Sequence, residues 1–239
     1  MHATEHQLRA FPAGVQSARG LQPAVAAGAE TGLLRTGPQR LKRIFDIGFT
    51  ALLALASLPP GLLIALAIAL DSRGPVFFGH TRAGRNQRPF RLWKFRSMVA
   101  NADEILGAYL RQNPERYREW ALTHKLRDDP RITRVGRLLR KTSLDELPQL
   151  WNVLRGDMSM VGPRPIVAEE IVKYGPAFAL YSRVSPGLTG LWQVSGRNDT
   201  HYSRRIELDC YYIRNWTPAL DLNILLRTVW VIVRGHGAY

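Results

Sequence analysis

The sequence is poor in cysteine and in the motifs that identify most classes of enzyme. Its 239 residues include one cysteine, Cys210, so no disulfide framework can form and a reducing compartment is expected. The six histidines have no metal-ligand spacing, and there is no Walker-type phosphate loop, no GxGxxG after a strand and no GxSxG elbow. Carboxylates and arginines therefore remain as the candidate groups for chemistry.

Acidic residues are also scarce. The chain has 19 Asp and Glu against 33 Lys and Arg, which gives a net charge of +14 and a pI near 10.7. Such an excess indicates a polyanionic neighbour: nucleic acid, an anionic membrane surface or a phosphate-rich substrate. Hydrophobic residues make up 46%, enough to bury a core, and the length predicts one domain with appendages. Residues 1–40 are rich in Ala, Gly, Gln and Pro without an apolar period, so we expect a flexible N-terminal tail.

One long apolar segment predicts a membrane element. The stretch from Ile47 to Leu70 carries no charge, and as a straight helix it would be roughly 36 Å long, enough to cross a hydrocarbon core of about 30 Å. Pro59 and Pro60 lie in its centre, where each removes a backbone donor and clashes with the preceding turn. We therefore predict that the helix kinks or stops there, with Ser57 bonding to a freed backbone group.

The charges on both sides of this segment favour a helix that enters the membrane and returns. A spanning helix usually has more Lys and Arg on its cytoplasmic side than on the other. Here both flanks are basic, with Arg40, Lys42 and Arg43 before the segment and Arg73 and Arg82 after it. We predict a re-entrant membrane helix over residues 41–72 and a cytosol-facing domain over residues 73–239. A kinked helix that spans the membrane is the alternative.

The remaining sequence predicts a mostly α fold with a small β-hairpin. Aromatic-rich runs at 76–78 and 90–95 flank turn residues and predict the hairpin. An arginine at every third position beside apolar residues predicts an amphipathic helix at the membrane interface; these arginines are Arg131, Arg134, Arg137 and Arg140. Further helical stretches are expected at 102–124, with a break at Pro114, and near 147–154, 167–183, 202–214 and 219–233. The expected fold class is a monotopic membrane protein with a Pro-broken re-entrant helix and interfacial amphipathic helices.

Two adjacent carboxylates, Asp145 and Glu146, follow this basic run in the sequence TSLDELPQLW. Ser143-x-x-Glu146 is a capping-box pattern, so one interpretation is a helix cap. Pro148 indicates instead that the helix begins near Leu147, where its dipole and the neighbouring cations would favour the ionised carboxylates. An ionised carboxylate can attack phosphorus while its neighbour binds Mg²⁺. The spacing alone favours the cap, and both interpretations stay open.

Four blocks of the sequence resemble the bacterial sugar transferase family. They are KFRSM (94–98), DPRITRVGRLLRKTSLDELPQLWNVLRGDMSMVGPRP (129–165), PGLTGLWQVSGRND (186–199) and RIELDCYYIRNW (205–216), and they lie in the order found in that family. The resemblance extends from about Leu41 to Val233. The family comprises monotopic phosphoglycosyl transferases, which start polysaccharide and glycoconjugate assembly on a polyprenyl (undecaprenyl) phosphate carrier.

The resemblance implies a reaction and a site. Asp145 would attack the sugar-bearing phosphate of a UDP-sugar, release UMP and carry the phosphosugar until polyprenyl phosphate accepts it. Glu146 would hold Mg²⁺, and Arg140 and Arg164 would bind phosphate oxygens. The enzyme would lie on the cytoplasmic (inner) membrane with its catalytic domain facing the cytoplasm.

Other residues receive weaker assignments from the same resemblance. Arg197 and Asn198 match a stretch associated with the nucleotide, and a plain glycine-flanked turn is the alternative. Asp209 is a second candidate for the metal or nucleotide, with a core-satisfying role equally compatible. Lys94 and Arg96 would contact phosphate or lipid headgroups, unless they are simply surface strand residues.

Two other classes of protein fit parts of the sequence. A membrane-tethered nucleic-acid binder would explain the charge, but no recognition helix or aromatic RNA-binding motif accompanies it. A non-catalytic assembly scaffold would have no need of the adjacent carboxylates. We therefore expect a UDP-sugar, polyprenyl phosphate and the lipid surface as partners, and no nucleic acid; the sequence does not specify an oligomeric state.

Overall fold

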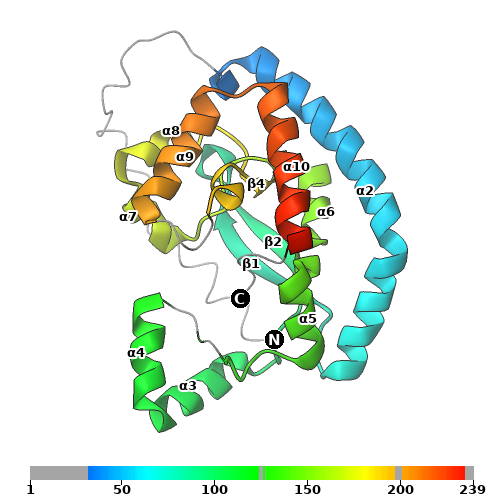
Figure 1. Ribbon diagram of the computed structural model, residues 1–239, viewed down its shortest axis with the longest axis vertical. Helices are drawn as coiled ribbons and strands as arrows, with labels where there is room; N and C mark the ends of the chain where they lie inside the picture. The colour runs from blue at the N-terminus through cyan, green and yellow to red at the C-terminus, as the bar shows by residue number, and fades with distance from the viewer. Residues whose placement is uncertain (1–31, 124–125, 127, 197–200, 235–239) are drawn as a thin grey trace.

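The structure is a computed structural model, and it describes residues 32–123, 126, 128–196 and 201–234. Most of the predicted N-terminal tail, together with Arg197 and Asn198, lies outside these residues. The described chain is mostly helical with a small antiparallel sheet, as predicted. Figure 1 shows one long helix, α2, arching along one edge, with the remaining elements on its concave side.

The elements follow one another in this order. After a short turn η2 (Gly32–Leu34) come α2 (Thr36–Asp71), β1 (Phe77–Ala83), η3 (Arg85–Gln87), β2 (Pro89–Phe95), α3 (Ala102–Gln112), α4 (Pro114–Thr123), α5 (Arg134–Thr142), η4 (Leu144–Glu146) and α6 (Gln149–Arg155). The second half contains β3 (Ser159–Val161), η5 (Ala168–Glu170), α7 (Ile171–Tyr174), η6 (Gly175–Ala177), α8 (Phe178–Tyr181), β4 (Gly187–Thr189), η7 (Trp192–Val194), α9 (Tyr202–Arg214) and α10 (Pro218–Arg234).

The two sheets are small and differ in how well the sequence predicted them. Strands β1 and β2 form the predicted hairpin, with Phe77 opposite Phe95 and Ala83 opposite Pro89. Strands β3 and β4 pair in parallel, with Ser159 opposite Gly187, and were not predicted. Each has three residues, which is too short for an alternating pattern to stand out. The predicted helix over 167–183 is also divided, because Gly175 has a φ of 50° and Pro176 follows it.

Helix α2 is continuous over both prolines and does not stop there. It begins at Thr36, inside the range predicted as tail, and it changes direction about midway along its length (Figure 1). The Ser57 hydroxyl donates to the Ala54 carbonyl at 2.9 Å, and not to the carbonyls of Leu55 and Ala56, whose usual donors the prolines replace. The predicted kink is therefore present as a bend within one helix.

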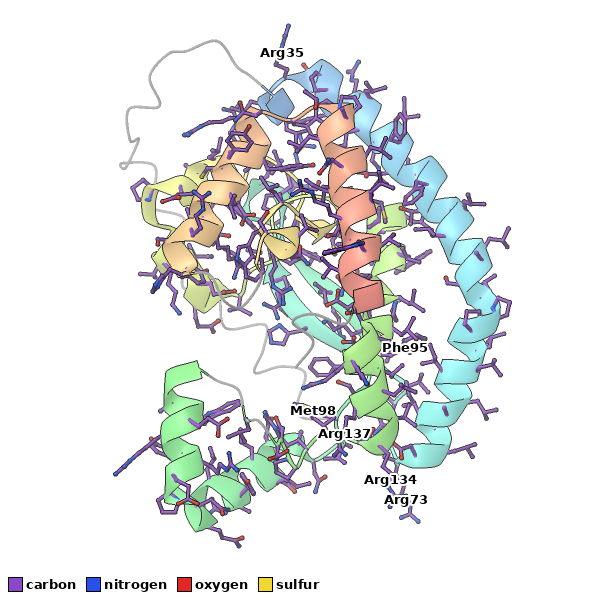
Figure 2. The ribbon with its side chains drawn as sticks, in the orientation of Figure 1. Arg35, Arg73, Phe95, Met98, Arg134 and Arg137 are labelled. Atoms are coloured by element: carbon purple, nitrogen blue, oxygen red, sulfur yellow. The ribbon has the colours of Figure 1, made fainter. Side chains whose placement is uncertain are left out.

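The surface of α2 is apolar and exposed. Among the described residues it is the one helix long and apolar enough to cross a membrane. Large exposed side chains occur along its whole length, among them Ile44, Leu52, Leu62 and Leu70, and Leu70 is 80% exposed. Figure 2 shows Arg35 at one end of the arch, and Arg73, Arg134 and Arg137 gathered at the other. Both ends of the apolar helix are thus basic.

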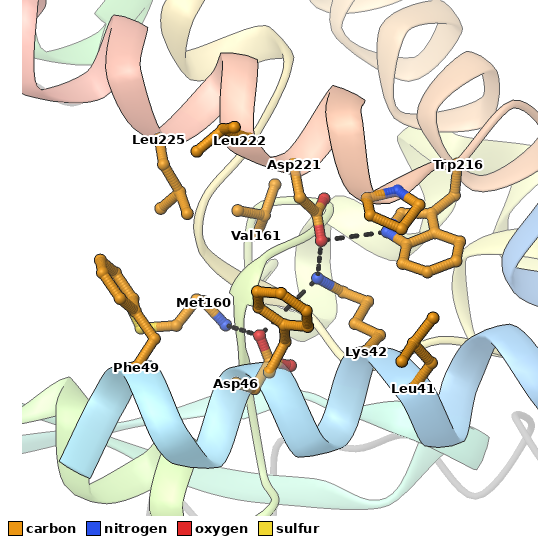
Figure 3. A pocket seen from close by; sticks show the side chains of 12 residues that line it. Leu41, Lys42, Asp46, Phe49, Met160, Val161, Trp216, Asp221, Leu222 and Leu225 are labelled. Atoms are coloured by element: carbon orange, nitrogen blue, oxygen red, sulfur yellow. Dashed lines mark hydrogen bonds and ion pairs between the residues drawn. The ribbon is translucent and has the colours of Figure 1, made fainter. Parts of the chain in front are cut away.

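The first half of α2 is fixed to the body of the protein by buried charges (Figure 3). Lys42 is 6% exposed and lies 2.6 Å from Asp221 of α10 and 3.7 Å from Asp46. Asp46 accepts a hydrogen bond from the Met160 amide at 3.1 Å. Apolar side chains surround this network and line a cavity of about 130 Å³; they include Leu41, Phe45, Phe49, Leu222 and Leu225. The beginning of α2 is therefore anchored to α10 and β3.

Candidate active site

The adjacent carboxylates lie in η4, a single turn between α5 and α6. Helix α5 ends at Thr142, and the next residue, Ser143, has a left-handed φ of 58° that turns the chain away from the helix axis. Ser143 makes no side-chain capping bond to η4, and α6 begins only at Gln149, directly after Pro148. The capping-box interpretation is therefore wrong. The predicted start of the helix after both carboxylates is confirmed, two residues later than expected.

Lys94 of β2 lies between the two carboxylates. Its ammonium Nζ is 2.7 Å from Glu146 Oε1 and 3.4 Å from Asp145 Oδ2. Asp145 is 8% exposed, whereas Lys94 and Glu146 are partly open to solvent. Strand β2 contributes this side chain because Lys94 pairs with Phe78 on a hairpin face that is turned toward η4. The structure thus joins three of the predicted site residues, and it does so across about fifty positions of sequence.

Burial raises the pKa of the Asp145 carboxyl above its usual value, and the neighbouring Glu146 charge adds to this, while Lys94 and Arg140 oppose it. We expected its surroundings to lower this pKa, and the direction is the opposite. Sequence reasoning counted the nearby cations but could not count the loss of water around the carboxyl. Lys94 is the strongest of the influences that oppose this rise in the Asp145 pKa.

Arg140 is held beside this site by the close approach of α5 to the chain after β2. Its Nε donates to Ser97 Oγ at 2.9 Å, and the Thr133 amide donates to the Ser97 carbonyl at 3.2 Å. The approach requires Gly136, since a Cβ at this position would lie 2.0 Å from the Ser97 carbonyl oxygen. Arg140 is half-buried, and burial lowers its pKa while the Asp145 and Asp129 charges raise it. A guanidinium therefore lies next to the buried carboxylate, as predicted.

A second ion pair supports Arg140, and we did not predict it. Arg131 binds Asp129 through two bonds, Nε to Oδ1 at 2.8 Å and Nη2 to Oδ2 at 2.6 Å. Its guanidinium lies 4.9 Å from the centre of the Trp120 ring of α4. The spacing Asp-x-Arg at 129–131 is the one signal in the sequence, and it resembles many unrelated surface turns. The two charges of this pair act on the Arg140 pKa in opposite directions, since Asp129 raises it and Arg131 lowers it.

Asp71, the last residue of the long apolar helix α2, connects this helix with α5. Its Oδ2 accepts from the Val135 amide at 3.0 Å, in the first turn of α5, where Thr133 also caps through the Gly136 amide at 2.9 Å. The end of the apolar helix and the start of the helix that carries Arg140 are thus fixed to each other.

Arg96 is buried, and its side chain is bonded to the loop that follows α2. Its guanidinium makes five hydrogen bonds to the segment 72–75, from Nε, Nη1 and Nη2 to the Ser72 hydroxyl and the carbonyls of residues 72 to 75. Arg96 is 6% exposed. These bonds occupy all of its donor nitrogens, so this geometry favours a role in closing the loop after α2 over contact with phosphate or lipid.

Arg164 and Asp209 lie together near α9 and not in η4. Arg164 follows β3 between two prolines and its guanidinium lies 5.8 Å from the centre of the Trp192 ring. Asp209 is 2% exposed and accepts from the Tyr174 hydroxyl at 2.7 Å. Burial raises its pKa to about 7, against the opposing effects of Tyr174, Arg205 and Arg164. Of its two predicted roles, this environment favours the core-satisfying one over metal binding.

The donor set of η4 suits a hard divalent cation completed by substrate. Within the described residues there is no group of three or more His, Cys, Asp or Glu side chains that could hold a metal. Mg²⁺ is commonly held by one or two carboxylates together with substrate phosphates and water. Asp145 and Glu146 supply such oxygens. The Lys94 ammonium lies within 3.4 Å of an oxygen of each, so the two carboxylates are close enough together to share one cation.

Comparison with known proteins agrees with this arrangement. The model of the bacterial sugar transferase family matches residues 38–235. Exopolysaccharide production protein ExoY of Sinorhizobium fredii is 46% identical over 211 residues, which cover 88% of this chain and 93% of that protein. Undecaprenyl-phosphate galactose phosphotransferase of Salmonella typhimurium is 46% identical over 210 residues, 88% of this chain and 44% of that protein. Undecaprenyl-phosphate glucose phosphotransferase of Komagataeibacter xylinus is 42% identical over 205 residues, 79% of this chain and 35% of that protein.

The chain therefore belongs to the bacterial sugar transferase family, as its sequence blocks predicted. As a member of this family it is an enzyme, a phosphoglycosyl transferase.

Proposed function

We propose that this enzyme transfers a sugar 1-phosphate from a UDP-sugar to a polyprenyl phosphate carrier, through a phosphosugar bound covalently to Asp145. The observation that carries the proposal is the buried Asp145 beside Glu146 and Lys94, in the sequence block that matches the family. Two relatives are named for undecaprenyl phosphate and for galactose or glucose, which supports the substrate classes.

In the first step an Asp145 carboxylate oxygen attacks the sugar-bearing phosphorus. The new Oδ–P bond forms as the bridging P–O bond of the diphosphate breaks, and UMP leaves with the bridging oxygen. In the second step an oxygen of polyprenyl phosphate attacks the same phosphorus, the Oδ–P bond breaks, and Asp145 returns as a carboxylate. The transfer is thus divided into two displacements at one phosphorus, each easier than a single direct transfer, which is the usual advantage of a covalent intermediate.

The surrounding side chains prepare Asp145 for this attack. A carboxylate that is 8% exposed has lost much of its hydration, which makes it a better nucleophile once it is ionised. Lys94 favours the ionised form, because its charge opposes the effect of burial on the Asp145 pKa. Arg140 is fixed by its bond to Ser97 and supplies positive charge for the phosphate oxygens. Mg²⁺ held by Glu146 and Asp145 would add positive charge at the diphosphate.

The shape of the molecule supports a re-entrant position at the cytoplasmic membrane. The other described elements lie on the concave side of the α2 arch (Figure 1). Large apolar side chains are exposed along the helix. Helix α10 also exposes apolar residues, among them Leu226, Val229 and Trp230. Arginines at both ends of α2 would contact headgroups of the same leaflet (Figure 2). The carboxylates would then lie at the cytoplasmic surface, close to a carrier phosphate.

The activity is tested by release of UMP from a panel of UDP-sugars by the purified protein with Mg²⁺ and polyprenyl phosphate. We expect release with at least one sugar and no release by Asp145→Asn. Asp103→Asn is the matched control, because Asp103 is an exposed aspartate of α3, and it should turn over like the wild type. Turnover that persists in folded Asp145→Asn would exclude Asp145 as the nucleophile.

The topology is tested separately by labelling single cysteines introduced near residues 38 and 75 in a Cys210→Ser background. A re-entrant helix places both positions on the cytoplasmic face, so an impermeant reagent should reach both from that side only. Labelling from opposite faces would show that α2 spans the membrane.

A further inference from the structure

Asp71 lies at a position where its own helix disfavours a carboxylate. It ends the part of α2 that follows the two prolines, residues 61–71, which we call the second arm of α2. The carboxyl end of a helix is the negative end of its dipole and favours a cation. The last turn of α2 contains no basic residue that would offset the Asp71 charge. The favourable partners of this carboxylate therefore lie outside α2.

The beginning of α5 has the opposite requirement. Its first turn starts with Arg134 and contains no acidic residue, although the positive end of a helix dipole favours an anion. Asp71 supplies this anion. Its Oδ2 accepts from the Val135 amide at 3.0 Å, and its carboxylate also accepts from the Thr133 hydroxyl. Asp71 thus satisfies the first turn of a helix that lies far along the chain from it.

Two hydrogen bonds extend this attachment from the start of α5 to Arg140. The Thr133 amide donates to the Ser97 carbonyl at 3.2 Å, and Arg140 Nε donates to Ser97 Oγ at 2.9 Å. Ser97 therefore contacts both the residue that Asp71 binds and the arginine whose charge acts on Asp145. Because α5 has only nine residues and moves as one piece, a tilt of its start away from Asp71 would displace Arg140 at its other end.

The apolar packing beside the site depends on the second arm of α2 as well. Ile68 of this arm is buried in one cluster with Phe95 and Leu139. Phe95 directly follows Lys94 in the chain, and Leu139 directly precedes Arg140. The arm also exposes large apolar side chains, which are Leu62, Leu63, Leu66 and Leu70. Two cationic side chains of the site are thus supported by a helical segment whose free surface is apolar.

Building on the proposed function, we propose that Asp71 is a positioning residue for the transfer reaction, which holds the start of α5 so that Arg140 stays beside the η4 carboxylates. Asp71 acts through α5 and Ser97 and touches none of the reacting groups. Without its carboxylate the Val135 amide loses its acceptor and α5 loses the anion at its positive end. Since the second arm enters the membrane in the proposed function, the position of Arg140 then depends on the membrane-embedded part of the chain.

The test is a double-variant cycle on kcat for transfer of the phosphosugar to polyprenyl phosphate by the full-length protein, with Asp71→Ala, Arg140→Gln and both changes together. We expect Arg140→Gln to lower kcat about 100-fold and Asp71→Ala to lower it about tenfold or more. The double variant should match Arg140→Gln within about twofold, because the two residues act through one contact. A merely structural role would lower the amount of active enzyme by the same factor in both backgrounds, so the two losses would multiply.

Two further variants complete the experiment. Asp71→Asn keeps an oxygen that can accept from the Val135 amide but loses the charge, so its kcat should lie between those of Asp71→Ala and the wild type. Thr217→Ala is the matched control, because it removes a bond of the same kind at the start of α10, where the Leu220 amide donates to Thr217 Oγ1 at 3.1 Å. This control should lower the free energy of unfolding and leave kcat unchanged.

Wild-type kcat in folded Asp71→Ala would overturn the proposal, and so would a double variant in which the two single losses multiply. If Asp71→Ala does not fold, the same cycle with Asp71→Asn decides by the same two outcomes. Wild-type kcat in Arg140→Gln would refute the role of Arg140 in the proposed function and this inference with it. The cycle measures transfer and not the intermediate, so a failure of the covalent mechanism can be told apart from a failure of this assignment.

Discussion

Replacing Gly136 by alanine should separate α5 from the segment that follows β2. The added Cβ would lie 2.0 Å from the carbonyl oxygen and 2.6 Å from the carbonyl carbon of Ser97, and both are backbone atoms that cannot rotate away. Helix and segment must therefore move apart by at least about 1 Å. The shift would break the bond from Arg140 Nε to Ser97 Oγ, now 2.9 Å long. Overpacking of this kind lowers the free energy of unfolding by about 1–3 kcal/mol.

The same displacement should lower kcat for UMP release by about 100-fold, because misplacing a charged group by about 1 Å has such effects on rate. Gly107→Ala in α3 is the control, since its Cβ would meet only the flexible end of Arg111 at 3.4 Å. It should leave activity unchanged and raise the free energy of unfolding by about 0.5–1 kcal/mol. Denaturant unfolding and steady-state kinetics of both variants give the answer. Wild-type kcat in Gly136→Ala would refute the claim that α5 positions Arg140 through this contact.

Three further predictions concern single side chains. Lys94→Met removes the main influence that lowers the pKa of Asp145. The acid limb of the kcat/KM profile should therefore move to higher pH, with about tenfold loss on that limb and less on the plateau; an unmoved limb would contradict the role of Lys94. Arg96→Gln removes five hydrogen bonds to the segment 72–75 and should lower the free energy of unfolding by about 2–3 kcal/mol. The KM for UDP-sugar should stay the same, and a raised KM would instead support contact of Arg96 with phosphate. Folding raises the pKa of Asp209 from 3.8 to about 7, so between about pH 4 and pH 7 the native protein binds one more proton than the unfolded chain. Its stability relative to Asp209→Asn should therefore fall as the pH rises through this range. A constant difference in Tm between the two proteins would show that Asp209 does not titrate there.

The sequence predicted well the elements that carry a local signal. The uncharged run of α2, the aromatic arms of the hairpin and the arginine period of α5 each extend over several residues, and the structure contains all three elements. Helix α5 begins only at Arg134, so the prediction that Arg131 belongs to it was wrong. Prediction from the sequence failed where the local pattern is short or where the structure depends on residues far apart in the chain. Strands β3 and β4 have three residues each, and the break of the predicted 167–183 helix rests on Gly175 and Pro176 alone.

In the candidate site, too, the residues that are close in sequence could be predicted, and the contacts between distant residues could not. Asp145, Glu146 and Arg140 are close in sequence, so one motif could identify them together. Lys94 was grouped with Arg96 because both are cations of the same block. Strand β2 ends at Phe95, so Lys94 on the strand reaches the carboxylates, whereas Arg96 lies after the strand and bonds to the segment 72–75. The direction of the Asp145 pKa shift depends on burial, and burial is decided by every element packed around η4.

The covalent intermediate at Asp145 is tested most directly by isotope exchange in the absence of any lipid acceptor. With an intermediate, the first step is reversible by itself, so labelled UMP should enter the UDP-sugar pool when only enzyme, Mg²⁺ and UDP-sugar are present. We predict exchange by the wild type and none by Asp145→Asn, with Asp103→Asn exchanging normally. Absence of exchange in a wild-type preparation that still transfers the phosphosugar to polyprenyl phosphate would contradict the covalent mechanism.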